Sequence, residues 1–291
     1  MNRRLIVPAL LVVIVAAIAP AHAQKPTSPE LQAPSAAPCP PGATSLCIPL
    51  DATFTVVRFD GPGGNGPADP LDPCQRNDDD TSVSLALPFT FDLYGTSHTS
   101  VFINNNGNIS FGAAFSTFTP SGFPVSGFPM VAPLWSDVDT RAPTSTVGGV
   151  VYYKLEANRL TVIWDHVGYY DQHDGLLNTY QLIITDGTDP LVGIGRNVCF
   201  CYDDMQWTTG DASGGVGGFG GTPATAGINK GDGVAFSLLG RFDHAGSDYD
   251  GPGGVADGIS YLDGRTFCFD ASGPDPIAVK SATWGEIKSR F

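Results

Sequence analysis

Short runs of β-branched and aromatic residues, interrupted by Gly, Pro, Asn or Asp, follow one another from Phe54 onward. Such side chains fit a pleated sheet, whereas the four interrupting residues favour turns. Only three of the acidic residues are Glu, and Asp favours turns and caps over helix interiors. The pattern therefore predicts an all-β chain, built as one large antiparallel β-sandwich-like domain with long Gly- and Asp-rich loops.

The expected strands are the longest of these runs: 54–59, 83–93, 100–104, 108–111, 149–153, 160–164, 179–185, 198–202, 233–239 and 266–270. Asn105-Asn106-Gly107 lies between the third and fourth runs. An Asn-Gly pair in this setting predicts a hairpin with a type I′ turn, whose two central residues need positive φ. A polar recognition patch is the alternative interpretation of these asparagines. Residues 210–221 are rich in Gly and poor in apolar side chains, which predicts a long surface loop.

The N-terminus predicts export. Arg3 and Arg4 precede an apolar run that contains Pro8, and Ala21-His22-Ala23 supplies the small residues that signal peptidase recognises. An uncleaved anchor is the alternative, but the run is shorter than the roughly 20 residues that span a bilayer. We therefore expect a secreted or cell-surface protein with no transmembrane segment in the mature chain. Its expected parts are a signal peptide over 1–23, a disordered Pro/Ala-rich tether over 24–38, a β domain over 39–272 and a C-terminal tail over 273–291.

The tail contains a segment, 281–288, that could form one short amphipathic helical turn. Trp284 lies within it and could either dock a partner or fold back onto the domain.

The formal net charge is -14 and the isoelectric point is about 4.4. Nucleic acids and anionic membranes attract clustered Lys and Arg, and no such cluster occurs here. Nucleic acid is therefore excluded as an expected partner.

The six cysteines all lie in the part expected to be exported: Cys39, Cys47, Cys74, Cys199, Cys201 and Cys268. An even number in an oxidising compartment predicts disulfides. Cys39 and Cys47 are close enough in sequence to staple the start of the domain. Cys199 and Cys201, two apart in an expected strand, point to one face and are expected to reach other segments. A zinc site is the alternative, although the spacing lacks paired Cys-x2-Cys knuckles.

Two Asp-rich segments make calcium the one cofactor that the sequence suggests. A hard cation takes several carboxylate, amide and carbonyl oxygens from a flexible loop. The candidate ligands are Asp78, Asp79 and Asp80 in the first segment, and Asp243, Asp248, Asp250 and Asp257 in the second. Neither segment has EF-hand spacing, so solvated turns are the alternative interpretation.

No catalytic residue is predicted. The segment 210–215 approximates the nucleophile segment of trypsin-like proteases, but Ala212 interrupts the contiguous Gly-Asp-Ser-Gly-Gly. Neither G-x-S-x-G nor H-E-x-x-H occurs. No pair of carboxylates is singled out for glycoside hydrolysis. The chain is therefore expected not to be an enzyme.

The segment 128–141, Phe-Pro-Met-Val-Ala-Pro-Leu-Trp-Ser-Asp-Val-Asp-Thr-Arg, resembles the signature of the nidogen extracellular (NIDO) domain. Blocks at 148–153, 164–181 and 205–210 agree with it in order and spacing. The similarity is strongest over 99–239, with flanks like those of single-domain secreted or bacterial-surface members. The residues that match the family motif are Trp135, Asp137, Asp139, Asn178, Gln206 and Trp207.

The resemblance implies an extracellular, non-enzymatic module of cell-matrix or cell-surface adhesion. Its partner would be an extracellular matrix protein, a cell-surface protein or a glycan. A carbohydrate-binding module of the cell envelope is the alternative, and it would need exposed aromatic side chains along a groove. A secreted hydrolase is a third class.

The motif residues also have a physical interpretation of their own. Trp135, Trp164 and Trp207 have apolar or aromatic neighbours, which favours burial over ligand stacking. Asp137 and Asp139 alternate with an apolar residue, so both carboxylates are expected on one side of a strand end. There they could cap a turn, bind an ion or hold Arg141.

Overall fold

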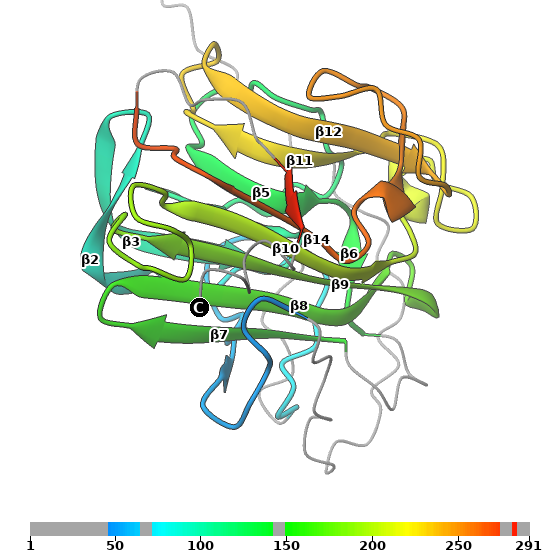
Figure 1. Cartoon of the computed structure of the whole chain (residues 1–291). Helices are drawn as coiled ribbons and strands as arrows, with labels where there is room; N and C mark the ends of the chain where they lie inside the picture. Colours follow the sequence, from blue (N-terminus) through cyan, green and yellow to red (C-terminus); the bar gives the residue numbers. More distant parts are fainter. Residues whose placement is uncertain (1–45, 65–71, 142–148, 274–280, 284–291) are drawn as a thin grey trace, which may run out of the picture.

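The computed structural model describes residues 46–64, 72–141, 149–273 and 281–283. Within these ranges the strands form two sheets that pack face to face (Figure 1). The prediction of an all-β sandwich is confirmed. The expected signal peptide, the tether over 24–38, Cys39 and Trp284 lie outside the described residues. The described part of the chain has no helix long and apolar enough to cross a membrane.

The first sheet has the order β1-β7-β8-β9-β10-β14-β15, with β6 pairing β8. Its strands are β1 (Thr55–Val56), β6 (Val138–Asp139), β7 (Val150–Glu156), β8 (Arg159–Tyr169), β9 (His173–Thr185), β10 (Val198–Met205), β14 (Arg265–Phe269) and β15 (Ser281–Thr283). All of its pairings are antiparallel. The long strand β9 lies in the middle and carries much of the core.

The second sheet has the order β13-β12-β11-β5-β4-β3-β2. Its strands are β2 (Leu85–Leu93), β3 (Thr96–Asn104), β4 (Asn108–Ser110), β5 (Met130–Trp135), β11 (Ala224–Asn229), β12 (Phe236–His244) and β13 (Asp257–Gly258). Only β12 and β13 are parallel among these pairs. Two short 3₁₀ helices, η1 (Asp211–Ser213) and η2 (Ile259–Tyr261), lie in the connections.

The main core fills the space between the sheets, where alternate residues of each strand point inward. Three smaller apolar clusters cover the outer faces. One surrounds the disulfides on β10, one lies between the segment from Leu46 and β7 and β8, and one lies between β5 and the loop 112–129. Central strands are therefore buried on both faces, and β5 and β11 have no exposed residue.

β5 and β11 were not among the expected strands. β5 contains Pro133, which cannot donate to a sheet ladder, and β11 is short and rich in Ala and Gly. Pro133 is tolerated because the pairing of β5 with β11 is irregular at that point. Its carbonyl oxygen also accepts a hydrogen bond from the Tyr202 hydroxyl of the opposite sheet, at 2.7 Å.

The hairpin predicted at 105–107 forms, but the predicted turn type is wrong. Three residues, not two, connect β3 and β4, and only Gly107 has positive φ, 74°. A Cβ atom at this position would lie 1.9 Å from the carbonyl oxygen of Leu134. Glycine is therefore required both by the backbone conformation and by the close approach of β5.

The expected helical turn in the tail is also wrong where the structure describes it. Residues 281–283 form β15, which pairs antiparallel with β14 at Phe267↔Ser281.

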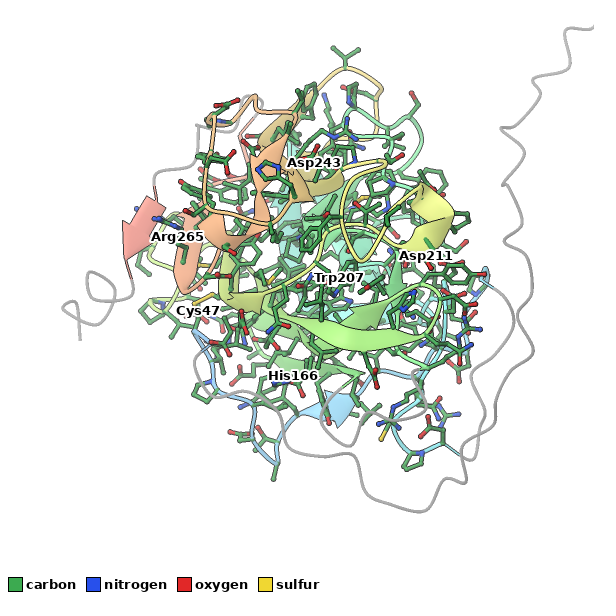
Figure 2. All side chains as sticks on the ribbon, turned by 90° about the vertical axis from the view of Figure 1, so that its right-hand side faces the viewer. Cys47, His166, Trp207, Asp211, Asp243 and Arg265 are labelled. Carbon is green, nitrogen blue, oxygen red and sulfur yellow. A yellow bond between two sulfur atoms is a disulfide. The ribbon has the colours of Figure 1, made fainter. Side chains whose placement is uncertain are left out.

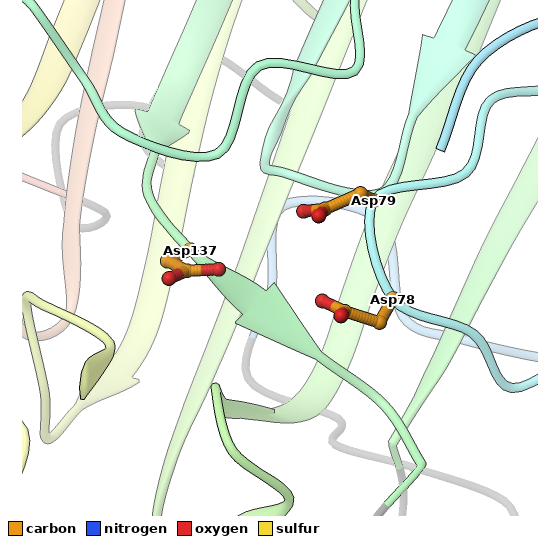
Figure 3. A group of neighbouring side chains, drawn as sticks. All are labelled: Asp78, Asp79 and Asp137. Carbon is orange, nitrogen blue, oxygen red and sulfur yellow. The ribbon is translucent and has the colours of Figure 1, made fainter. Parts of the chain in front are cut away.

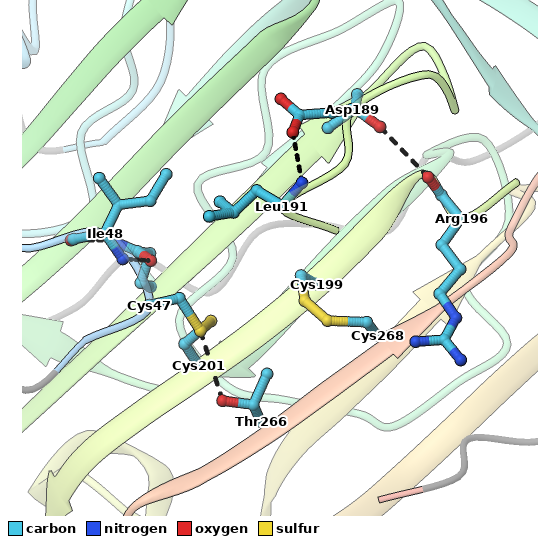
Figure 4. Close-up of a disulfide and its surroundings, with 11 residues drawn as sticks. Cys47, Ile48, Asp189, Leu191, Arg196, Cys199, Cys201, Thr266 and Cys268 are labelled. Atoms are coloured by element: carbon cyan, nitrogen blue, oxygen red, sulfur yellow. Dashed lines mark hydrogen bonds between the residues drawn. A yellow bond between two sulfur atoms is a disulfide. The ribbon is translucent and has the colours of Figure 1, made fainter. Parts of the chain in front are cut away.

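Two disulfides lie side by side on the outer face of the first sheet (Figure 4). Cys201 bonds to Cys47, and Cys199 bonds to Cys268 on the neighbouring strand. The suggested pairing of Cys39 with Cys47 is therefore wrong, because the segment from Leu46 runs over this face, where Cys201 points outward. Cys199 and Cys201 do reach other segments, as predicted, and Cys74 is also disulfide-bonded.

The Cys47–Cys201 bond joins residues 154 positions apart. A cross-link over so long a loop restricts the unfolded chain strongly, so we expect the double variant Cys47→Ser, Cys201→Ser to lose about 2–5 kcal/mol of unfolding free energy. Urea unfolding measures this loss. The double variant Cys199→Ser, Cys268→Ser is the control and should lose less, because its loop spans 69 residues. An equal or larger loss in the control would contradict the prediction.

Candidate functional site

Three buried carboxylates converge where β5 passes into β6. Asp78, Asp79 and Asp137 each offer an oxygen atom within 4.8 Å of the others (Figure 3). Among the described residues this is the one group of three His, Cys, Asp or Glu side chains that could hold a metal ion. We call it the acidic cluster.

Backbone pairing brings its two segments together. Asp78 forms an isolated antiparallel bridge with Asp139, and Thr81 forms one with Asn104. Asp79 lies between Asp78 and Thr81 in the sequence. Its φ is 66°, a left-handed conformation that Asp and Asn tolerate better than most residues. The segment is thus an irregular edge that turns its carboxylates toward the end of β5.

Buried asparagines hold this segment in place. The Asn105 side chain donates to the carbonyl and side-chain oxygens of Asn77, at 2.9 and 2.6 Å. The Asn106 side chain donates to Asp79 at 2.8 Å and accepts from the backbone N–H of Val138 at 3.0 Å. The side-chain amide of Asn106 therefore links Asp79 to β6, which directly follows Asp137 in the chain.

Arg141 lies beside the acidic cluster. Its guanidinium donates two hydrogen bonds to Asp139, at 2.9 and 2.8 Å, and one to Asp78, at 3.1 Å. Burial disfavours the charged form of Arg141, but its hydrogen bond to Asp139 and the charges of Asp139, Asp78 and Asp171 outweigh burial and raise its pKa. Asp139 thus holds Arg141, whereas Asp137 belongs to the acidic cluster.

Gly210 closes the other side of Asp137. A Cβ atom at Gly210 would lie 2.7 Å from a carboxylate oxygen of Asp137, so any larger residue would push into the acidic cluster. The backbone of Asp137 also accepts a hydrogen bond from the N–H of Tyr170 at 3.2 Å.

The remaining motif residues pack and brace the core. Trp135, Trp164 and Trp207 are fully buried, and each indole N–H donates to a backbone carbonyl; Figure 2 shows Trp207 among the interior side chains. The Asn178 side chain accepts from the backbone N–H groups of Gln206 and Trp207, at 2.6 and 3.1 Å, and donates to the carbonyl of Trp207.

The second Asp-rich segment is arranged differently. Asp243 and Asp248 both contact His244. The carboxylate of Asp257 accepts from the backbone N–H groups of Asp250 and Arg241, at 2.9 and 3.2 Å. These side chains therefore support the loop itself, and they form no metal-sized group among the described residues.

Of the seven predicted calcium ligands, Asp78 and Asp79 meet in the acidic cluster, and Asp80 follows them in sequence outside it. Asp137 was singled out as a family-motif residue, and ion binding was one of the roles left open for it. Its alternation with Asp139 was the available sequence signal, but nothing local linked it to residues almost sixty positions earlier. Hard divalent cations prefer oxygen ligands, so the acidic cluster suits calcium better than a softer metal.

Comparison with known proteins gives a family match. The NIDO-related family model matches residues 66–246. Alpha-tectorin of Gallus gallus is 31% identical over 196 residues, 57% of this chain and 9% of that protein. Alpha-tectorin of Homo sapiens is 32% identical over 189 residues, which cover 55% of this chain and 8% of that protein. Nidogen of Drosophila melanogaster is 25% identical over 161 residues, which cover 47% of this chain and 12% of that protein.

The chain thus spans only a small part of the length of these curated relatives. No solved structure matches it significantly.

The calcium hypothesis stays a prediction, and the geometry narrows it to the acidic cluster. We expect excess calcium to raise the thermal unfolding midpoint relative to chelator, because an ion bound only to the folded state stabilises it, by about 2.7 kcal/mol at 100 times its dissociation constant. Asp79→Asn should abolish the shift. Asn keeps an oxygen for Asn106 and tolerates the positive φ of this position.

The matched control is Asp250→Asn, which removes one exposed carboxylate from the second segment and should leave the calcium shift unchanged. Calorimetry of all three proteins in calcium and in chelator makes the comparison. A wild-type midpoint that does not respond to calcium would contradict the hypothesis, as would an unchanged shift in the Asp79 variant.

Proposed function

The chain belongs to the NIDO-related family, and on that premise we propose that it is a secreted, non-enzymatic interaction module of the extracellular matrix type. Its proposed partner is a matrix or cell-surface protein. The observation that carries this proposal is where the motif residues lie. All of them except the half-buried Gln206 lie in the interior, so contact with a partner falls to the exposed loops.

The histidines and the candidate serine support a non-enzymatic role. Ser213, in the protease-like segment, has its hydroxyl 3.0 Å from that of Thr119. His173 instead contacts Asp211 at 2.9 Å. A serine nucleophile needs a base within hydrogen-bond reach, and this segment does not bring one to Ser213.

The surface favours a protein partner over a stacked sugar. Phe236, at 41% exposure, is the one strongly exposed aromatic side chain among the described residues. Tyr261 is covered by Tyr249 on one side and lies against the guanidinium of Arg265. Sugar recognition by stacking needs exposed rings, and this part of the chain offers no row of them.

Two Gly-rich loops at one end of the sandwich are the proposed contact region (Figure 1). They are 211–221, which follows β10, and 245–256, which follows β12. Each carries a strongly exposed apolar side chain: Val216 is 84% exposed and Val255 is 65% exposed. Loops on a rigid sheet scaffold are where binding residues usually lie.

The test is binding of the immobilised full mature chain to a panel of purified extracellular matrix proteins and to a glycan array. We expect saturable binding to a matrix protein, weakened several-fold by Val216→Asp, because a new charge would have to be desolvated at the contact. The unfolding free energy of this variant should change by less than about 0.5 kcal/mol, as for other exposed positions.

Ile194→Asp is the matched control. Ile194 is 73% exposed, and it precedes β10, whereas Val216 follows it, so the two lie at opposite ends of the strand. The control should bind like the wild type. Binding to glycans alone, or equal weakening by both substitutions, would contradict the proposed contact region.

A further inference from the structure

The loop 245–256 leaves the end of β12 and returns to the same strand. His244 is the last residue of β12, and β13 then pairs parallel with it at Phe242↔Asp257 and His244↔Gly258. Two backbone hydrogen bonds join the two ends of the loop: the N–H of Gly258 donates to the carbonyl of Asp248 at 2.9 Å, and the N–H of Ser260 donates to the carbonyl of Gly246 at 2.8 Å. We call these paired ends the neck of the loop, and His244 lies beside it.

Both ring nitrogens of His244 face carboxylates. Nδ1 lies 2.6 Å from an oxygen of Asp243, and Nε2 lies 3.0 and 3.1 Å from the two oxygens of Asp248. Asp243 belongs to β12 and Asp248 belongs to the loop. The imidazole thus ties the loop to the strand through its side chains, in addition to the backbone bonds of the neck.

This geometry depends on the protonation state of the ring. A neutral imidazole carries one N–H and can donate to only one acceptor, whereas the imidazolium ion donates from both nitrogens. Ionised carboxylates accept hydrogen bonds but cannot donate them. Both contacts are therefore complete only when His244 is doubly protonated.

We propose that His244 is a pH-dependent latch on the loop 245–256, closed while the imidazole is doubly protonated and released when it loses a proton. The latch also reaches the neighbouring loop. The carbonyl oxygen of Asp243 accepts the N–H of Gly220 at 2.6 Å, so the latch lies where the loops 211–221 and 245–256 meet. In Figure 2 Asp243 lies in the upper part of the molecule, above Trp207.

The surrounding charges set the direction of the response. The hydrogen bonds to Asp243 and Asp248, in that order, raise the pKa of His244, and burial opposes them only weakly. The latch is therefore fully closed below the ordinary histidine value of 6.5 and is lost as pH rises through the raised pKa. The bond from His244 lowers the pKa of Asp248, which keeps that carboxylate ionised throughout this window.

Other titratable groups near the neck change protonation outside the pH range in which His244 titrates. Burial raises the pKa of Asp257 on β13, whose carboxylate accepts from the N–H groups of Asp250 and Arg241. Its protonation acts on the acid side of the window. Burial also raises the pKa of Tyr249, whose hydroxyl donates to the carbonyl of Leu239, so Tyr249 stays neutral.

Hydrogen exchange of the full mature chain tests the latch. After correction for intrinsic exchange rates, we expect amides of 245–260 to lose protection several-fold between pH 6 and pH 9. The side-chain ¹⁵N signals of His244 should show both nitrogens protonated at pH 6. His244→Gln should leave the loop weakly protected at both pH values, because the two N–H donors of a side-chain amide lie on one nitrogen and cannot take the places of the two ring nitrogens that face Asp243 and Asp248.

His173→Gln is the matched control. His173 is similarly exposed, 43% against 41%, but contacts one carboxylate, Asp211. This variant should keep the wild-type pH response of 245–260. Equal responses in wild type and the His244 variant would overturn the proposal, as would a neutral His244 at pH 6.

Asp248→Asn separates the two contacts, because it removes the loop's carboxylate and leaves the pair of His244 with Asp243. We expect the pH response of the loop to be lost while His244 still titrates. A preserved loop response in this variant would show that the loop does not depend on the second contact and would overturn the latch. Because these readouts need no binding partner, they do not depend on the proposed function.

Discussion

The buried turn at 105–107 is the constraint on which the rest of the structure depends. Backbone groups away from water must find partners, and a turn inside a sandwich has no solvent to supply them. Here the Trp164 indole of the opposite sheet donates to the carbonyl of Asn105. The backbone N–H of Leu134 donates to the carbonyl of Gly107. The turn that joins β3 to β4 thereby also fixes the distance between the two sheets.

The acidic cluster follows from the same turn. The side chain of Asn106, in this turn, donates a hydrogen bond to Asp79 and accepts one from the backbone N–H of Val138 in β6. Buried carboxylates are costly unless they are hydrogen-bonded or paired, and Arg141 supplies a partly buried cation at one edge. Gly210 leaves the space that the carboxylate of Asp137 occupies. The fold therefore concentrates negative charge at a place where its geometry is already rigid.

Local patterning predicted the strands that contain runs of β-branched and aromatic residues, including β10, whose first five residues are all buried. It failed at β5, which contains Pro133, and at β11, which is short and rich in Ala and Gly. Disulfide partners and the meeting of Asp79 with Asp137 depend on register between distant strands, which spacing alone does not encode. The family motif located Asp137 without indicating its neighbours.

Two kinds of interaction hold the molecule, and they respond differently to solution conditions. The core depends on apolar packing and indole-to-carbonyl hydrogen bonds, and disulfides brace the outer face of the first sheet; none of these involves a group that titrates near neutrality. Three of the four histidines within the described ranges instead pair with aspartates, His166 with Asp165, His173 with Asp211 and His244 with Asp243. These rings are all partly exposed and lie where strands end or bulge. A change in pH near neutrality must therefore act on the loop-bearing ends of the sandwich before it reaches the core.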